Sequence, residues 1–205
     1  RFPISRAWSL PSAAMSDHAG IDVTNVTAWL DAHIEGARGP YTFDLIAGGH
    51  SNLTFAVQDA ADNHFVLRRP PLGHVLASAH DMSREHRIIS GLQNSSVPVA
   101  PALGFCDDLD VNGAPFYVMS YVDGNVVHDL DEARSTLSVE ARDNASRSLV
   151  DTMATIHSVD LDATGLTDLG RHKGYIARQL KRWYSQWNQG KTRELEAVDR
   201  VHAAL

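Results

Sequence analysis

The sequence predicts an α+β protein: a five-stranded antiparallel sheet with one inserted helix, followed by helices alone. Short apolar runs bounded by turn signals recur up to residue 122, which is typical of strands. After Asp123-Gly124 the strand pattern stops, and apolar residues recur at helical spacing. With 43% hydrophobic residues among 205, the chain can close a core, and no apolar run approaches the roughly 20 residues that cross a bilayer.

The first expected element is a helix. Apolar residues between Val23 and Ile34 lie on one helical face, with Asp22 or Thr24 available as N-cap and Gly36 as stop. After Gly39-Pro40 the pattern becomes extended, and Pro70-Pro71 cannot continue a strand. We therefore expect three consecutive antiparallel strands, over residues 41–46, 53–57 and 65–69.

A second helix is expected from Val75 to Leu92, with Gly91 near its end. Two further strands, 102–106 and 116–122, flank a polar turn over 107–113, and helices are expected over 139–159, 175–188 and 192–205. We divide the chain into a non-native or disordered leader (1–15), a first lobe (16–122) and the start of a helical lobe (123–205) that we expect to be incomplete. The leader has no continuous apolar core of a secretion signal, and Met15 resembles a natural start.

Composition narrows the function classes. The formal charge is −7, from 18 Lys and Arg against 25 Asp and Glu, which argues against a nucleic-acid partner. We also expect no membrane partner, and the sequence does not predict the oligomeric state. The single cysteine, Cys106, cannot form an internal disulfide, and no Cys or His spacing is typical of zinc. A reducing, cytoplasmic location follows as the expectation.

A glycine-rich segment lies between the first two expected strands: Gly48, Gly49, His50, Ser51 and Asn52. Because no helix follows it, the segment is neither a Walker loop nor a dinucleotide fingerprint. Its glycines would let backbone N–H groups approach phosphate oxygens. The alternative is an ordinary hairpin turn, which glycine and asparagine also favour.

Charged residues follow in a suggestive order. Arg68 and Arg69 end the third strand, and Glu85 lies within the next helix. Protein kinases place a strand lysine and a helix glutamate in this order over the nucleotide phosphates. The alternative is a charged strand end and a solvated helix face.

The fifth expected strand turns polar at its end, through Met119, Ser120, Tyr121 and Val122. In a two-lobed kinase such a segment is the hinge, whose backbone groups hydrogen-bond the adenine edge. Equally, it can be a buried strand that ends in the Asp123-Gly124 turn.

Six segments in order carry a family resemblance. They read Gly-Gly-His-Ser-Asn-Leu-Thr-Phe, Phe-Val-Leu-Arg-Arg-Pro-Pro, Arg-Glu-His-Arg-Ile-Ile, Val-Pro-Val-Ala-Pro, Phe-Tyr-Val-Met-Ser-Tyr-Val-Asp-Gly and Thr-Ile-His-Ser-Val-Asp. Over about residues 23–205 the chain resembles the aminoglycoside phosphotransferase family of small-molecule kinases. The run Gly174–Trp183, with Trp187 after it, looks like the branch associated with some acyl-CoA dehydrogenases.

The resemblance implies a protein-kinase-like fold whose cleft binds ATP and Mg²⁺. Within it, the loop Gly48–Asn52 would cover the phosphates, Arg68 would stand where better-known kinases have lysine, and Glu85 would orient it. The hinge Met119–Val122 would hold the adenine. Whether Arg68 or Arg69 faces the cleft stays open at this point. The acceptor would be a hydroxyl of a small metabolite, with a hydroxy acid or a hydroxyacyl-CoA favoured over an antibiotic.

The family's catalytic segment is absent. Its members carry His-Gly-Asp, whose aspartate acts on the acceptor hydroxyl, then an Asn and a further Asp for the metal. None of the 11 histidines here has an aspartate two residues later, so we assign no catalytic and no metal-binding residue. We expect the missing residues beyond Leu205, and the chain alone to be inactive. The rivals are a non-catalytic, pseudokinase-like nucleotide-binding module and a generic interaction domain.

A basic and aromatic helix remains. Arg178, Lys181 and Arg182 precede or flank Trp183, with Trp187 one turn further. In one interpretation Arg178 and Arg182 lie near a negatively charged acceptor. In the other, which we favour, the tryptophans anchor a core and the cations form a solvated face.

Overall fold

A computed structural model describes residues 19–46, 52–73, 80–124, 126–170 and 173–205. By its internal contacts the chain divides into one compact unit that ends at Thr164 and a second that spans Gly165–Leu205. The expected leader, and the loop members Gly48 to Ser51, lie outside the described residues. The lobe boundary expected at residue 123 stays a prediction.

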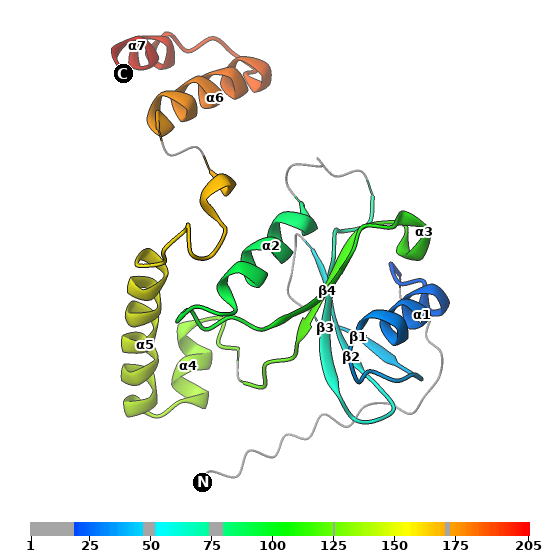
Figure 1. Cartoon of the computed structure of the whole chain (residues 1–205). Coiled ribbons are helices and arrows are strands. Elements are labelled where there is room, and N and C mark those ends of the chain that lie inside the picture. The colour runs from blue at the N-terminus through cyan, green and yellow to red at the C-terminus, as the bar shows by residue number, and fades with distance from the viewer. Residues whose placement is uncertain (1–18, 47–51, 74–79, 125, 171–172) are drawn as a thin grey trace. The chain divides into compact units, whose positions relative to one another are not determined.

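Five antiparallel strands form one sheet in the first unit, which confirms the predicted fold class (Figure 1). Neighbours in the sheet follow the order β1-β2-β3-β5-β4, and every pair is antiparallel. The strand bounds fall within two residues of those expected. They are β1 (Thr42–Leu45), β2 (Leu53–Gln58), β3 (His64–Arg69), β4 (Ala102–Cys106) and β5 (Phe116–Ser120).

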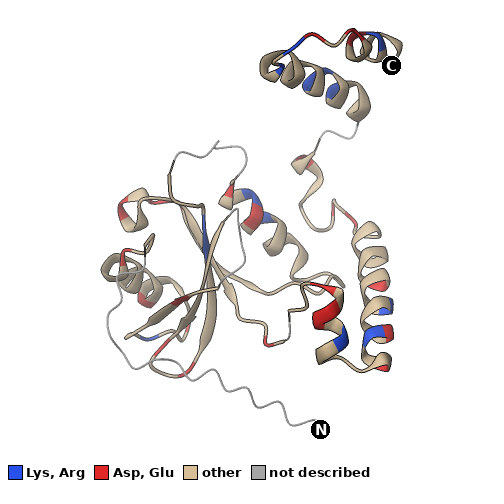
Figure 2. Ribbon diagram, turned by 180° about the vertical axis from the view of Figure 1, so that it is seen from behind, with Lys and Arg blue, Asp and Glu red and all other residues tan. Residues whose placement is uncertain are grey.

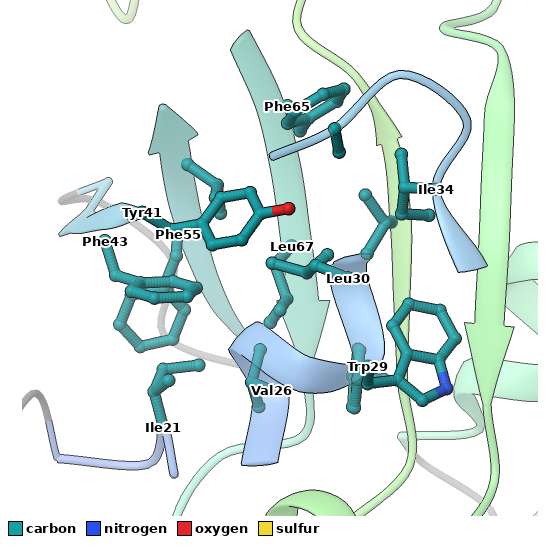
Figure 3. Packing of buried hydrophobic residues seen from close by; sticks show 14 of the residues in the cluster. Ile21, Val26, Trp29, Leu30, Ile34, Tyr41, Phe43, Phe55, Phe65 and Leu67 are labelled. Carbon is teal, nitrogen blue, oxygen red and sulfur yellow. The ribbon is translucent and has the colours of Figure 1, made fainter. Parts of the chain in front are cut away.

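Helix α1 (Val23–His33) covers one face of this sheet. It begins where predicted, because the Asp22 carboxylate accepts a hydrogen bond from the Asn25 N–H at 3.0 Å. Its fully buried Val26 and Leu30 pack against sheet residues such as Phe55 and Leu67 (Figure 3). This apolar layer is the core of the unit and fixes the sheet.

Gly104 allows α1 to approach β4 closely. A Cβ atom there would lie 2.9 Å from Trp29 Cη2 and 3.0 Å from Ile34 Cδ1, closer than carbon atoms normally pack. The Trp29 ring in turn meets Phe116 edge-on, with centroids 4.9 Å apart. Only glycine leaves room for this contact.

Helix α2 (Met82–Leu92) lies on the opposite face of the sheet, over β4 and β5 (Figure 1). It starts later than the expected Val75, because the Asp81 carboxylate caps it by accepting the Arg84 N–H at 3.0 Å. Residues 74–79 lie outside the described part of the chain. His86 stacks on Phe105 of β4, with ring centroids 5.3 Å apart.

One short helix lies between β4 and β5, where no helix was expected. The segment 107–113, predicted as a polar turn, contains α3 (Leu109–Asn112). The Asp108 carboxylate accepts the Asp110 N–H at 2.9 Å, and Gly113 ends the helix in the left-handed region at φ 66°. The prediction of a turn was therefore wrong, because the same residues cap a single helical turn.

The remaining described elements are helical, as predicted, and two of them, over 130–136 and 167–169, lie outside the expected helix ranges. The first unit adds α4 (Leu130–Thr136) and α5 (Val139–His157), and the second unit contains η1 (Thr167–Leu169), α6 (Tyr175–Gly190) and α7 (Glu196–Ala204). The last helix starts four residues later than predicted. Between α6 and α7, the Tyr184 hydroxyl donates a hydrogen bond to Asp199 Oδ1 at 2.7 Å. The Tyr184 ring also stacks on the His202 ring, with centroids 3.8 Å apart. No helix of the described residues has the length and apolar character of a membrane span.

Candidate functional site

Arg68, Tyr117 and Glu85 meet on the sheet face that α2 covers. The register pairs Arg68 of β3 with Tyr117 of β5, so both side chains point to this face. From α2, the Glu85 Oε2 atom lies 2.9 Å from Arg68 Nε and accepts the Tyr117 hydroxyl hydrogen at 3.1 Å. The structure thus brings together the arginine and the glutamate that the sequence placed in kinase order.

The Arg68 guanidinium is only partly engaged by Glu85. Its buried Nε makes no hydrogen bond, because the N–H does not point at the carboxylate despite the 2.9 Å distance. Among the described residues its Nη groups have no hydrogen-bond partner either. The side chains of Arg68 and Glu85 are 32% and 33% exposed, so a ligand can reach the pair.

Arg69 points to the opposite face of the sheet, because side chains alternate along a strand. The residue is buried, its Nε donates to the Pro70 carbonyl oxygen at 3.1 Å, and its Nη1 donates to the carbonyl oxygens of Gly20 and Asn112. Burial lowers the pKa of the Arg69 guanidinium. Arg69 therefore joins the N-terminal segment to the sheet, and Arg68 is the arginine beside Glu85.

Asn52 contributes a buried amide to the same site. Only 6% of this residue is exposed, its Nδ2 donates to Glu85 Oε1 at 2.9 Å, and its Oδ1 lies 2.7 Å from His80 Nδ1. The side chain of Asn52 is directed at Glu85, and its expected place in a phosphate-covering loop stays a prediction. Its companions Gly48, Gly49, His50 and Ser51 lie outside the described residues.

Sequence reasoning missed the participation of His80 and Tyr117. His80 falls within the helix expected over 75–92 and was given no part in the site, yet it is half-buried against Asn52. Tyr117 carries no motif of its own. Burial and the nearby Glu85 charge raise the pKa of the Tyr117 phenol, while the Arg68 charge opposes them. Its hydroxyl therefore remains protonated and acts as a donor.

An apolar row lies next to the charged pair on the same face. Ala56, Val66 and Met119 are direct partners across β2, β3 and β5, two positions along from Thr54, Arg68 and Tyr117. Val66 is buried. This places a flat apolar surface beside the cation.

The expected hinge follows this row. Ser120 donates its N–H to the Pro101 carbonyl oxygen at 2.9 Å, and Tyr121 donates its N–H to the His64 carbonyl oxygen at 3.4 Å. Tyr121 is 42% and Val122 67% exposed. The role of Met119, Ser120, Tyr121 and Val122 towards an adenine stays a prediction.

The basic residues of α6 belong to the second unit, Gly165–Leu205 (Figure 2). Arg182 is exposed, and Arg178 donates from Nη1 to the Lys173 carbonyl oxygen. Trp183 is 58% exposed, so it is no core anchor within this unit, in contrast to the interpretation that we favoured. A substrate role for Arg178 and Arg182 stays a prediction.

Comparison with known proteins gives consistent matches. The model of the phosphotransferase enzyme family matches residues 42–205. Acyl-CoA dehydrogenase family member 10 of Mus musculus is 32% identical over 97% of this chain and 17% of its own length. Acyl-CoA dehydrogenase family member 11 of Rattus norvegicus is 31% identical over 90% of this chain and 24% of its own. The chain thus spans at most about a quarter of these relatives.

A solved structure shares the fold. The crystal structure of a candidate aminoglycoside phosphotransferase from Ralstonia eutropha superposes with a TM-score of 0.70 and 30% sequence identity. The match covers 89% of this chain and 52% of that one. The sheet and its flanking helices therefore occur in a solved protein of the expected kind.

Proposed function

This chain belongs to the phosphotransferase enzyme family, and from that premise we propose that it binds ATP for transfer of the γ-phosphoryl group to a hydroxyl of a small metabolite. The observation that supports this most is the Arg68–Glu85 pair on the α2 face. It places a carboxylate 2.9 Å from a cation whose Nη groups have no hydrogen-bond partner among the residues that the structure describes. Such a pair is a common means of holding nucleotide phosphates.

The residues present fit the nucleotide. Arginine binds phosphate oxygens through two parallel N–H donors, and the Arg68 Nη groups have no other partner among the described residues. The neighbouring apolar row of Ala56, Val66 and Met119 offers a surface for a purine ring. An anion site beside an apolar surface on one sheet face is the pattern that a nucleotide requires.

The described residues do not supply a magnesium site, since they hold no cluster of three or more His, Cys, Asp or Glu side chains placed to bind a metal. Transfer of the phosphoryl group to a hydroxyl releases ADP and requires a base for the hydroxyl proton. Because no histidine precedes an aspartate by two residues, we propose that this base lies outside the present sequence.

The acceptor class follows from the dehydrogenase relatives alone. Both relatives are named as acyl-CoA dehydrogenases. We propose a hydroxy acid or a hydroxyacyl-CoA as acceptor. The alternative function is a non-catalytic nucleotide-binding module, which the lack of a His-x-Asp sequence favours.

Calorimetric titration with ATP tests the proposal. We expect wild type to bind ATP and Arg68→Ala to weaken binding about tenfold, as for the loss of hydrogen bonds to a charged group. Arg84→Ala removes the same charge from an exposed position on α2, so it is the matched control and should bind like wild type. Absence of ATP binding by wild type, or equal losses in both variants, would contradict the proposal.

Phosphoryl transfer needs a separate assay. With ATP, Mg²⁺ and a 3-hydroxyacyl-CoA, we expect no ADP release above background from the 205-residue chain. Acceptor-dependent ADP release would show that the base is within this sequence after all. ATP binding without any turnover in a longer protein would favour the non-catalytic module.

A further inference from the structure

Asn52 and His80 form a chain of hydrogen bonds that ends on Glu85. Asn52 precedes Glu85 by 33 positions and His80 follows Asn52 by 28, so only the fold brings them together. The Asn52 amide bridges the two, with 2.9 Å to the carboxylate and 2.7 Å to the imidazole. A buried amide with both ends satisfied has a single defined orientation.

The charge of Glu85 fixes that orientation. If the amide were reversed, its oxygen would face a carboxylate oxygen, and two acceptors would be in contact without a proton between them. Nδ2 must therefore face Glu85, which leaves Oδ1 towards His80. It follows that His80 Nδ1 carries a hydrogen and donates it to Asn52.

Neutral donors therefore orient both oxygens of the carboxylate. Asn52 donates to Oε1 and Tyr117 donates to Oε2. Arg68, by contrast, contributes charge at 2.9 Å without an aligned hydrogen bond. Glu85 is thus held without Arg68, and its charge, 2.9 Å from Nε, keeps the guanidinium beside it while the Nη groups have no partner among the described residues.

We propose that Asn52 and His80 are positioning residues for Arg68: they fix Glu85, which in turn sets the direction of the guanidinium towards a nucleotide phosphate. This inference rests on the proposed function. It gives the Asn52 side chain a task different from the direct phosphate contact that its place in the glycine segment suggests. If the inference is right, the affinity for the phosphates of the nucleotide depends on Asn52, whereas the affinity for the nucleoside does not.

The test compares affinities for ATP and adenosine by competition against one fluorescent nucleotide. Asn52→Ala should weaken the affinity for ATP about fivefold, which corresponds to the loss of one hydrogen bond of about 1 kcal/mol. The affinity for adenosine should change less than about twofold. His80→Ala should weaken the affinity for ATP by a smaller factor, about threefold. His80→Asn should restore it, because the Asn amide nitrogen takes the place of Nδ1 and also donates.

Asn112→Ala is the matched control. Asn112 has the same side chain and the same 6% exposure, and it accepts the Asp22 N–H at 2.9 Å on the α1 side of the sheet. This variant should lose stability without changing the ratio of ATP to adenosine affinity. A changed ratio in Asn112→Ala would overturn the inference, because any buried amide would then have the same effect.

The outcomes separate the two proposals. If wild type binds no ATP, the proposed function fails and the inference fails with it. If Arg68→Ala loses ATP affinity while Asn52→Ala and His80→Ala keep it, the inference alone is wrong. Equal loss of ATP and adenosine in Asn52→Ala would show a purely structural role and would also overturn it. Should Asn52→Ala not fold, the ATP-to-adenosine ratios of His80→Ala and His80→Asn decide alone.

Discussion

The region from α1 to β5 and the helices that follow it differ in how their side chains are used. In the first region Leu30, Phe55 and Phe116 are almost completely buried. In α4, α5, α6 and α7 no residue is buried, and large apolar side chains such as Leu149, Ile176 and Trp183 are more than half exposed. Apolar side chains at regular spacing are therefore buried in the first region and exposed in the second.

The difference explains where the chemistry is found. Side chains on the α2 face of the sheet are held by packing and by partners from other elements, so a buried amide and a buried phenol can orient Glu85. The exposed helical faces in the described residues have no comparable constraint. A helix with an exposed apolar stripe signals an interaction surface without identifying what covers it.

Removal of the same side chain in each region should give the largest contrast. Leu30 is fully buried, whereas Leu149 is 63% exposed. We expect Leu30→Ala to lower the free energy of unfolding by about 3 kcal/mol, and Leu149→Ala to change it by less than about 0.5 kcal/mol. Urea denaturation of both variants measures this. Comparable losses would mean that α5 packs in solution as tightly as α1.

The N-caps provide a second, smaller contrast. Asp22 accepts the Asn25 N–H at the start of α1, and Ser138 accepts the Ala141 N–H at 3.1 Å at the start of α5. Asp22→Ala should destabilise the whole sheet region by about 1 kcal/mol, because α1 is part of its core. Ser138→Ala should weaken only α5.

Hydrogen exchange followed by mass spectrometry resolves the two effects. In Asp22→Ala, strand amides of β2, β3 and β5 should lose protection, whereas in Ser138→Ala the loss should be confined to α5 peptides. If Ser138→Ala also exposes the strands, the two regions unfold as one cooperative unit.

The smallest expected effect depends on pH. Burial against Phe105 lowers the pKa of His86 below its ordinary 6.5, so the unfolded chain takes up this proton first on acidification. Stability should therefore fall as the pH drops through 6.5 towards the folded-state pKa. Thermal melts at about pH 7.5 and 5.5 should show a smaller acid loss for His86→Gln than for wild type. His128→Gln, at an exposed site outside the sheet region, is the control. An unchanged loss in His86→Gln would contradict this prediction.

Much of the fold could be predicted because strands and amphipathic helices are local signals. The short apolar runs of β2 and β3 and the capped start of α1 are present in short windows of sequence. The short helix α3 was missed because Asp108 and Gly113 are equally suitable for a turn. The late start of α2 depends on the cap that the Asp81 side chain provides, which the apolar spacing from Val75 onward does not indicate.

The site was predicted in part. The order of Arg68 and Glu85 along the chain suggested their pairing, and the strand alternation decides which of two adjacent arginines takes part. The contributions of Asn52, His80 and Tyr117 depend on contacts across 28 to 33 positions, for which one sequence carries no signal. Tertiary hydrogen bonds of this kind appear only once the sheet and α2 are assembled.

Cys106, the lone thiol of the chain, gives the molecule an internal reporter. It is 3% exposed in the core layer between the sheet and α1, and burial raises the pKa of its thiol. An alkylating reagent must therefore wait until β4 and α1 separate before it can react. The rate at which the unaltered protein is labelled therefore measures how often this part of the core opens, with no added probe and no competing sulfhydryl.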